Sequence, residues 1–374
     1  MRKLFRVVAA VSAAVLVVAV APRPAQAAVD IIHKITQEED PFEARFPDVV
    51  KLADGRLMAV WHRSTEHAGV ESTIQLSFWS DGNGWSAPAN AFADPSVVDG
   101  WDTRDPKLGR MNDGSVVLTF FTAGKVYYSV WKPGWTRFTA PEQLTYPGAP
   151  TGIASHGAVL ALADSGGQTD QVLIPFYQDG AAGGAFFMRA TWRATVAPRL
   201  LVTGFHKIIA NDNPVGRRYS EPSFVQIGDT VVTAVRSENL DTANPSYRHA
   251  SPVIIARWNA YAATPSYTFQ SFTGVLASSH HLLKTSSGKV LFTYGNRASD
   301  GVRPTFGMMI DNPAGTWSGT PVPLYDSGLY DQANPSTVEP ADGWFWTLGY
   351  NAKTRAQSSN GGTLWVIRSQ TEDY

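Results

Sequence analysis

One pattern of apolar and polar positions recurs six times along the chain. Each copy is an apolar run, a tight turn centred on glycine, and a second apolar run, which together predict a β-hairpin. The copies span residues 47–61, 105–121, 156–177, 221–236, 280–295 and 334–350. Their turn glycines lie 52 to 62 residues apart, at Gly55, Gly114, Gly166, Gly228, Gly288 and Gly343.

A third apolar run follows each hairpin, at residues 73–79, 126–131, 185–192, 252–258, 306–310 and 364–367. Three to four antiparallel strands in each unit of about 58 residues predict an all-β chain folded as a six-bladed β-propeller. A solenoid or a pair of sandwiches is the alternative. The ends of the chain favour the ring, because residues 29–35 form one unpaired strand and the last unit stops after its third run. A first strand that completes the last blade would remove both free edges.

The first 28 residues have a different pattern. Basic residues precede an apolar run at 7–21, and the small-residue stretch 24–28 follows it. This is typical of a secretory signal peptide cleaved after Ala27 or Ala28. An uncleaved membrane anchor is the alternative, although the run is short for a span of about 20 residues. We therefore expect a secreted protein with one propeller domain, residues 29–374, and no membrane insertion after signal removal.

The amino-acid composition limits which binding partners and which stabilising features the protein can have. With 31 basic and 32 acidic residues, the net charge is −1, and no basic stripe indicates nucleic acid or anionic lipid. The absence of cysteine excludes a disulfide framework, so the core must hold the fold alone. Twelve Trp, 13 Tyr and 18 Phe can supply that core. We expect a monomer.

Polar residues gather where the first strand of each hairpin begins and the second ends. In a propeller these positions share one face, while the other hairpin ends carry ordinary turn residues. The gathered residues are Arg45, Arg63, Glu66, His67, Asp102, Arg104, Asp105, His156, Glu221, Arg236, His280, His281, Arg297, Asp331, Asn334 and Tyr350.

Five of these residues are arginines, whose guanidinium fork matches a carboxylate or a phosphate. They predict an anionic ligand; the alternative is that each arginine pairs with a neighbouring acid and ties blades together. Burial of Glu221 without a partner would be costly, so we expect it to pair with Arg236. Arg104 is expected to fix an acidic neighbour.

The two adjacent histidines could form a proton shuttle, a pair of metal ligands or a polar rim. Neighbouring residues on a strand point to opposite sides, so only one of His280 and His281 can face the ligand. No other His/Asp spacing supports a metal site. We therefore expect no metal and no cofactor.

Several short motifs fall in order along the units: Arg45-Phe46-Pro47 in the first, residues 80–85 and 311–317 as Trp-closed turns, Glu221 followed by Arg236, and residues 294–297. Together they resemble the sialidase (neuraminidase) superfamily over nearly all of the mature chain. The first resembles the Arg-x-Pro motif, and the two turns resemble a shortened and a degenerate Asp-box, or BNR repeat. The resemblance implies a carboxylate-binding triad of Arg45, Arg236 and Arg297.

The resemblance also implies a tyrosine nucleophile in the last blade, activated by Glu221, and an aspartate acid/base after the first hairpin. The best-aligned tyrosine position holds Asn334, with Tyr330 and Tyr350 nearby. The acid/base loop has no aspartate, so its candidates are Glu66 and His67, with Asp102 or Asp105 in reserve. The remaining candidates for substrate binding are Arg63, Arg104, His281 and Asn334.

Three functions follow as hypotheses. The first is a retaining exo-glycosidase that hydrolyses terminal acidic, sialic acid-like sugars from glycoconjugates. The second is a propeller polysaccharide lyase, in which arginines neutralise a uronate carboxylate while His67, His281 or a tyrosine removes the adjacent proton. The third is a non-catalytic carbohydrate-binding propeller, because a fold alone does not select a function.

Overall fold

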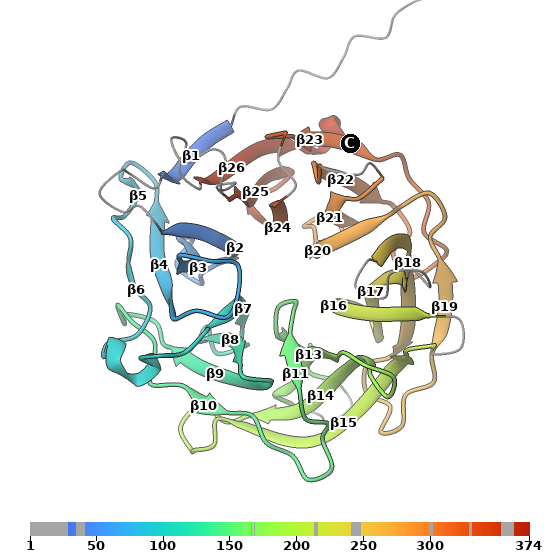
Figure 1. The fold of residues 1–374 in the computed structure, drawn as a ribbon, viewed down its shortest axis with the longest axis horizontal. Coiled ribbons are helices and arrows are strands. Elements are labelled where there is room, and N and C mark those ends of the chain that lie inside the picture. Colours follow the sequence, from blue (N-terminus) through green and yellow to red (C-terminus); the bar gives the residue numbers. More distant parts are fainter. Residues whose placement is uncertain are drawn as a thin grey trace, which may run out of the picture.

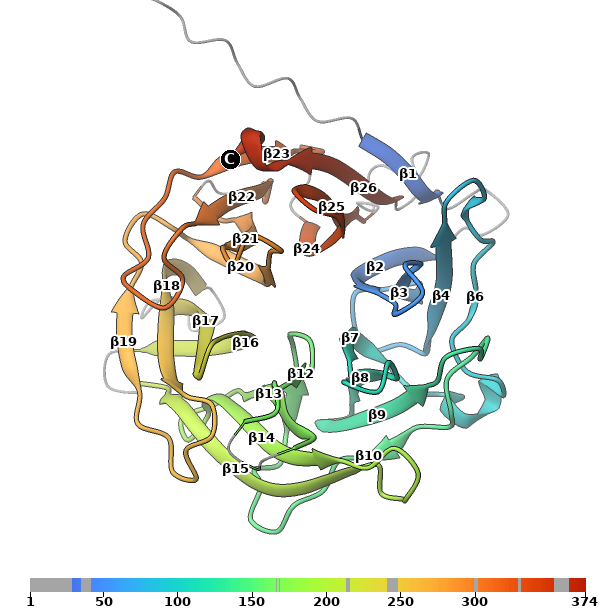
Figure 2. The same cartoon turned by 180° about the vertical axis from the view of Figure 1, so that it is seen from behind.

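Six small antiparallel sheets surround a central axis like the blades of a propeller (Figure 1; Figure 2 shows the opposite end). The structure is a computed structural model that describes residues 29–34, 42–165, 167, 169–212, 216–240, 248–298, 302–328, 331–352 and 363–374. The all-β prediction and the count of six blades are both confirmed. In the described residues, no helix is long and apolar enough to cross a membrane.

The strands follow the chain around the ring, with the first of each set nearest the axis (Figure 1). Blade 1 holds β2 (Glu43–Lys51), β3 (Leu57–Ser64), β4 (Ser72–Ser80), β5 (Gly84–Trp85) and β6 (Ala89–Asn90). Blade 2 holds β7 (Arg104–Arg110), β8 (Val116–Thr122), β9 (Lys125–Trp131) and β10 (Glu142–Gln143). Blade 3 holds β11 (Ile153–Ser155), β12 (Leu160–Ala161), β13 (Gln171–Gln178), β14 (Gly184–Trp192) and β15 (Leu200–Ala210).

The second half of the ring repeats this order. Blade 4 holds β16 (Arg217–Ile227), β17 (Thr230–Leu240), β18 (Arg248–Asn259) and β19 (Thr268–Ser271). Blade 5 holds β20 (Ala277–Lys284), β21 (Val290–Asn296), β22 (Thr305–Ile310) and β23 (Val322–Tyr325). Blade 6 holds β24 (Gln332–Ala341), β25 (Trp344–Asn351), β26 (Thr363–Gln370) and β1 (Val29–Lys34).

The ring closes as the sequence predicts. β1 pairs antiparallel with β26, with Val29 opposite Ile367, so the first strand becomes the outer strand of the last blade. The two Trp-closed turns join the third and fourth strands of blades 1 and 5. In the second of them, Trp317 is buried and its Nε1 donates to the carbonyl of Pro313 at 2.8 Å.

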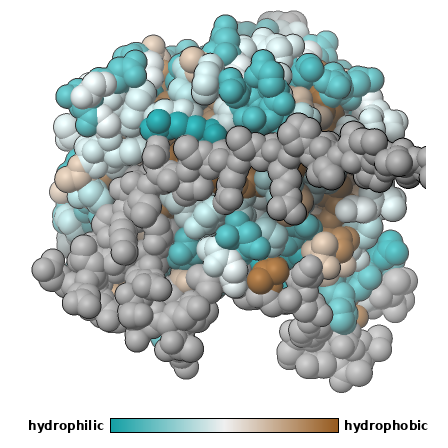
Figure 3. All heavy atoms as spheres, turned by 90° about the horizontal axis from the view of Figure 1, so that it is seen from above, coloured by the Kyte–Doolittle hydropathy of each residue, from teal (hydrophilic) through white to brown (hydrophobic). Residues whose placement is uncertain are grey.

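The core lies between neighbouring blades, where apolar side chains from facing sheets interlock. Trp61, Trp131, Trp365, Tyr128 and Phe292 are among its fully buried aromatic residues. Seen from the edge, the described surface is mostly hydrophilic, with isolated hydrophobic residues between polar ones (Figure 3). Inter-blade burial therefore does the stabilising work that disulfides would otherwise do.

The inner strands share an irregularity that shapes the site. Phe46, Asp105, Glu221 and Asn334 each have a φ between 48° and 53° and each precede a proline. A residue before proline is normally extended, so this left-handed conformation is strained. At each of these positions the register shifts by one residue, which defines a β-bulge. Such bulges re-aim side chains, here at the end of the ring where the polar residues gather.

Polar contacts between inner strands join the blades just beyond the bulges. Leu108 N donates to Asp48 Oδ2 at 2.5 Å, and Val49 N donates to Ser336 Oγ at 3.1 Å. Ser223 Oγ lies 2.9 Å from His280 Nδ1, which connects blades 4 and 5. These contacts fix the position of one inner strand against the next, so the side chains that the bulges present hold a defined geometry.

Candidate active site

Two clusters of charged side chains lie at the bulged ends of the inner strands. The first cluster joins blades 1 and 6 and contains Glu43, Arg45, His67, Asp331 and Tyr350. Arg45 forms ion pairs with Glu43 and Asp331, and its Nη1 lies 2.8 Å from His67 Nδ1. Tyr350 donates a hydrogen bond of 2.5 Å to Asp331 Oδ1, and His67 Nδ1 lies 3.2 Å from Asp331 Oδ2.

Asp331 is the centre of the first cluster. Burial alone would raise the pKa of its carboxyl, but hydrogen bonds from His67 and Tyr350 and the charge of Arg45 outweigh burial and lower it. Burial and the nearby Asp331 charge both raise the pKa of Tyr350. Tyr350 is therefore held as a neutral donor to Asp331, and its role as a nucleophile stays a prediction.

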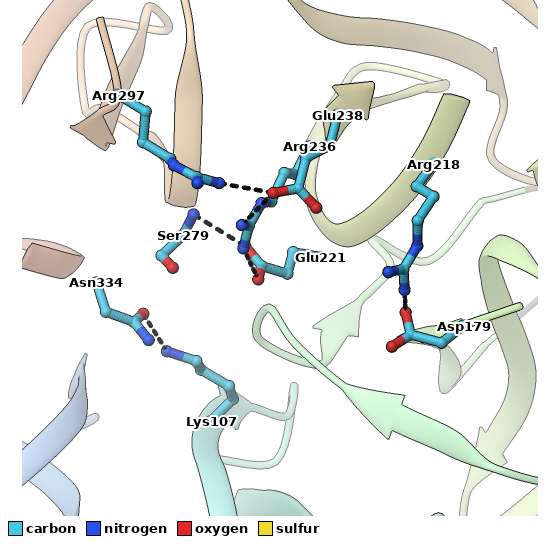
Figure 4. A network of polar contacts seen from close by, with 9 residues as sticks. All are labelled: Lys107, Asp179, Arg218, Glu221, Arg236, Glu238, Ser279, Arg297 and Asn334. Carbon is cyan, nitrogen blue, oxygen red and sulfur yellow. Dashed lines mark hydrogen bonds and ion pairs between the residues drawn. The ribbon is translucent and has the colours of Figure 1, made fainter. Parts of the chain in front are cut away.

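The second cluster joins blades 4 and 5 and contains Glu221, Arg236, Glu238, Ser279 and Arg297 (Figure 4). Arg236 Nη1 donates to Glu221 Oε1, which confirms the predicted pair. Arg236 Nη2 and Arg297 Nη1 each lie 2.6 Å from Glu238 Oε1, so two guanidinium groups share one carboxylate. The backbone N–H of Ser279 donates to Glu221 Oε2 at 2.9 Å.

These contacts settle the charge of Glu221. Burial opposes ionisation of this carboxyl, but the positive charge of Arg236 and the hydrogen bond from Ser279 contribute to a net lowering of its pKa. Glu221 is thus an ionised, firmly held carboxylate. Such a group is available as the acceptor for an attacking hydroxyl, while the same ion pair weakens it as a base.

Asp105 has the opposite tendency. Burial raises its pKa to about 6, helped by the charge of Glu221 and opposed by Lys107, His67 and Arg104. Its side chain remains partly exposed. Two carboxyl groups whose surroundings drive their pKa values apart are the usual signature of an acid and a base in one site. The reserve acid of the sequence analysis thus has the environment of a proton donor.

The remaining polar candidates of blades 1 and 2 are Asp102, Arg104 and Glu66. Asp102 accepts a hydrogen bond of 2.7 Å from Gly69 N and pairs with Arg104 Nε at 3.1 Å, as expected for Arg104. Arg104 also lies over the ring of Phe121. Glu66 is exposed in the loop after β3, one residue before His67.

Arg63 stands apart from the other arginines. In the strand register it lies opposite Ala44, whereas Arg45 lies opposite His62, so Arg63 and Arg45 occupy opposite faces of blade 1. Its guanidinium packs 3.8 Å from the centre of the Phe42 ring. This contact is a cation–π interaction on the side of the blade away from the first cluster.

The histidines differ from expectation in one respect. His280, not His281, is the member of the pair near Glu221, because the bulge at Ser279 shifts the register of β20 by one residue. His281 instead lines a cavity of about 540 Å³ on the axis beyond the bulges, and its Nδ1 lies 3.3 Å from Thr337 N. His156 lies with its ring centre 6.3 Å from that of His280 and also close to Glu221.

Some residues near the site escaped the sequence analysis. Glu43 and Glu238 stand two residues from Arg45 and Arg236 on the same strands, and that i, i+2 spacing was the available signal. Lys107 follows Asp105 by the same spacing and donates to Asn334 Oδ1 at 3.2 Å (Figure 4). Tyr177, at the end of β13, lies within electrostatic reach of Glu221 and Asp105, and its position at the end of the third hairpin was the available signal. Tyr330 lies outside the described residues.

The five arginines do not form a bare positive patch. Four of them, Arg45, Arg104, Arg236 and Arg297, pair with carboxylates, so the ion-pair alternative holds for these four. For Arg45 and Arg297 the partner belongs to a neighbouring blade. Any anionic ligand must therefore bind beside existing ion pairs. In the described residues, no group of three or more His, Asp or Glu side chains is arranged to hold a metal ion.

Solved structures place this fold among propellers of the sialidase type. A protein of unknown function from Dyadobacter fermentans superimposes with a TM-score of 0.68 at 15% identity, over 91% of this chain and 98% of its own. A point mutant of NanB sialidase from Streptococcus pneumoniae gives 0.67 at 10% identity, over 94% and 71%. The leech intramolecular trans-sialidase, in complex with 2,7-anhydro-Neu5Ac, gives 0.64 at 11% identity, over 92% and 70%.

The similarity to sialidases is therefore confirmed as a similarity of fold. The chain is a six-bladed propeller of sialidase-like architecture. Comparison of its sequence with protein-family profiles and with curated proteins gives no match.

Proposed function

We propose that this protein is a secreted glycoside hydrolase that releases terminal acidic sugars, of the sialic acid type, from glycoconjugates. The observation that carries the proposal is that Glu221, ion-paired with Arg236, and Asp105, whose pKa burial raises to about 6, act on each other electrostatically at the end of a sialidase-like propeller where the arginines gather. The pattern of residues 1–28 supports secretion.

In this proposal Asp105 is the general acid. It is neutral below about pH 6 and gives its proton to the leaving glycosidic oxygen. Glu221 accepts the proton of the attacking hydroxyl. Two hydroxyls are candidates: water, and Tyr177, whose neutral form is favoured by burial and by the charges of Glu221 and Asp105. Attack by a tyrosine gives a retaining reaction, and attack by water gives an inverting one.

The arginines recognise the carboxylate of the sugar. A guanidinium group carries five N–H donors, and Arg236 makes two side-chain contacts with carboxylates, to Glu221 and Glu238. Its second carboxylate, Glu238, is shared with Arg297, so the two guanidinium groups lie side by side where an incoming anion can bind. The existing ion pairs hold both guanidinium groups in place before the sugar arrives, which lowers the entropy lost on binding.

The second candidate is a uronate lyase. His67 supports it, because this half-exposed imidazole lies 3.2 Å from Asp331 and beside Arg45, an arrangement in which it can remove the proton next to a carboxylate. The third candidate function is the binding of acidic glycans without turnover.

One assay separates the three. The purified protein is incubated with sialylated glycans and with uronate polysaccharides, and free reducing acidic sugar and ultraviolet absorbance are followed together. A hydrolase releases reducing sugar with no new double bond, whereas a lyase creates the absorbance. Binding with neither product supports the carbohydrate-binding function. Glu221→Gln, purified in parallel, shows that any turnover belongs to this site.

A further inference from the structure

Lys107 is a buried cation at the centre of the ring. It stands on β7, two residues after Asp105, and is only 3% exposed. Its side chain extends toward the axis and meets Asn334 of blade 6 (Figure 4). Burial of an ammonium group is unfavourable unless nearby groups stabilise its charge, so this residue calls for a physical reason.

The direct contacts of the ammonium are with neutral oxygen atoms. Nζ donates to Asn334 Oδ1 at 3.2 Å and to the carbonyl of Pro47 at 3.5 Å. None of the ion pairs within 4 Å in the described parts of the chain includes Lys107. The charge is therefore fixed in position by two blades but is not neutralised by a carboxylate in contact with it.

The field of this charge reaches several titratable groups. It acts on Asp48 and Asp105, and on His156 and His281. Asp48 is fully buried and already accepts the N–H of Leu108, and His281 faces the cavity beyond the bulges. Of the two carboxyl groups, only Asp105 belongs to a residue that is partly exposed.

Asp105 is surrounded by charges from several elements. Lys107 and Arg104 come from its own strand, Glu221 from β16, and His67 from the loop after β3, while the hydroxyl of Tyr177 comes from β13. Among the cations, Lys107 has the largest effect on Asp105. Arg104 already pairs with Asp102, which compensates its charge locally.

We propose that Lys107 is a positioning residue for Asp105: an ammonium group on the same strand, two residues from the acid, that Asn334 and Pro47 hold in place. Its fixed charge favours the ionised form of the acid. The inference rests on the proposed function, in which Asp105 is the proton donor. It goes beyond that function by assigning the control of the acid to a residue that does not touch the sugar.

The test is a direct titration of Asp105 in full-length protein carrying ¹³C-labelled aspartate. Subtraction of the spectrum of D105N identifies the Asp105 carboxyl. Lys107→Gln removes the charge but keeps a donor for Asn334, and we expect the titration midpoint of Asp105 to rise by about one pH unit, as for a lost neighbouring charge. Lys107→Arg keeps the charge and should leave the midpoint close to that of the wild type.

Lys284→Met is the matched control, since it removes one positive charge from an exposed position on β20. It should leave the Asp105 midpoint unchanged. If Lys107→Gln is folded by circular dichroism and its midpoint is unchanged or lower, the inference is overturned. If Lys107→Gln does not fold, Lys107→Met is titrated under the same criteria.

Turnover supplies a second, separate readout. Where the wild type hydrolyses a sugar substrate, the basic limb of its kcat/KM profile should move to higher pH in Lys107→Gln, because the acid then keeps its proton longer. A protein with no turnover on any glycan overturns the proposed function and leaves the titration result standing. A normal profile in Lys107→Gln counts against the inference while the hydrolase remains.

Discussion

Glu221 and Arg236 are ion-paired although the strand register places Ser220, not Glu221, opposite Arg236. The bulge at Glu221 and Pro222 causes the difference. With a φ of 53°, Glu221 leaves the regular pleat, and its carboxylate reaches both Arg236 and the N–H of Ser279 on the next blade. Strain in one residue therefore brings a carboxylate into the site from the edge of a blade.

Because the carboxylate and the guanidinium depend on each other, replacement of either should abolish most activity. We expect Glu221→Gln and Arg236→Ala each to lower kcat/KM at least about 100-fold, since the first removes the proton acceptor and the second leaves Glu221 without its cation. The measurement is release of reducing acidic sugar. Arg257→Ala is the control, because this arginine of the same blade contacts Gln270 on the outer strand. Wild-type turnover in both site variants would refute the assignment.

The role of Asp105 predicts a dependence on the leaving group. Asp105→Asn removes the proton donor, so hydrolysis of a natural glycoside should fall at least about 100-fold, as is typical for loss of a general acid. An aryl glycoside with an acidic phenol needs little protonation, and its hydrolysis should fall far less. The wild-type basic limb should lie near pH 6, following the pKa of Asp105. Equal losses on both substrates would show that Asp105 is not the acid; Asp102→Asn serves as the comparison.

Tyr350 and Tyr177 should behave differently. Tyr350→Phe removes a hydrogen bond to Asp331, so we expect lower stability by about 1 kcal/mol and a higher KM, with kcat nearly unchanged. Tyr177→Phe removes a hydroxyl on which the charges of Glu221 and Asp105 act. If that hydroxyl is the nucleophile, kcat collapses and the wild-type product retains its configuration by NMR. An active Tyr177→Phe with an inverted wild-type product assigns the attack to water.

The fold could be predicted from the sequence because the hairpin pattern repeats six times and each copy contains a turn glycine. Ring closure was also predictable, since the strand at residues 29–34 had no partner in its own blade. Ion pairs within one strand or hairpin could also be predicted, because their residues are close in the sequence. Glu221 with Arg236, and Arg104 with Asp102, follow from local spacing.

Contacts between blades were not predictable. Asp331 with Arg45 joins residues 286 positions apart, and Lys107 with Asn334 joins residues 227 positions apart. Their meeting depends on how blades pack around the axis, which no local pattern encodes. The sequence predicted His281 in the site, but the structure places His280 there, because a one-residue bulge at Ser279 shifts the register. Ser279 has a left-handed conformation that no proline or glycine in the local sequence indicates.

Buried histidines should make the fold sensitive to mild acid. His62 is fully buried and stacked on Phe46, and neither of its ring nitrogens has a hydrogen-bond partner in the described structure. Burial, together with the charges of Arg45 and His67, lowers its pKa from 6.5 to about 3. In the unfolded chain the same imidazole takes up a proton below pH 6.5, so acid favours unfolding from about pH 6.5 down to about pH 3.

Replacement of this imidazole by a phenyl ring isolates the effect. In His62→Phe, the free energy of unfolding should fall less steeply with acid, by up to about 1.4 kcal/mol per pH unit between pH 6 and pH 4. At pH 8 both proteins bind no proton at this position, so the variant should be as stable as the wild type or more stable, since two unpartnered buried nitrogens are gone. Urea unfolding at pH 8, 6, 5 and 4 measures both quantities. Parallel pH dependences would show that His62 is already protonated in the folded protein or stays neutral when unfolded, and that its burial does not couple folding to pH.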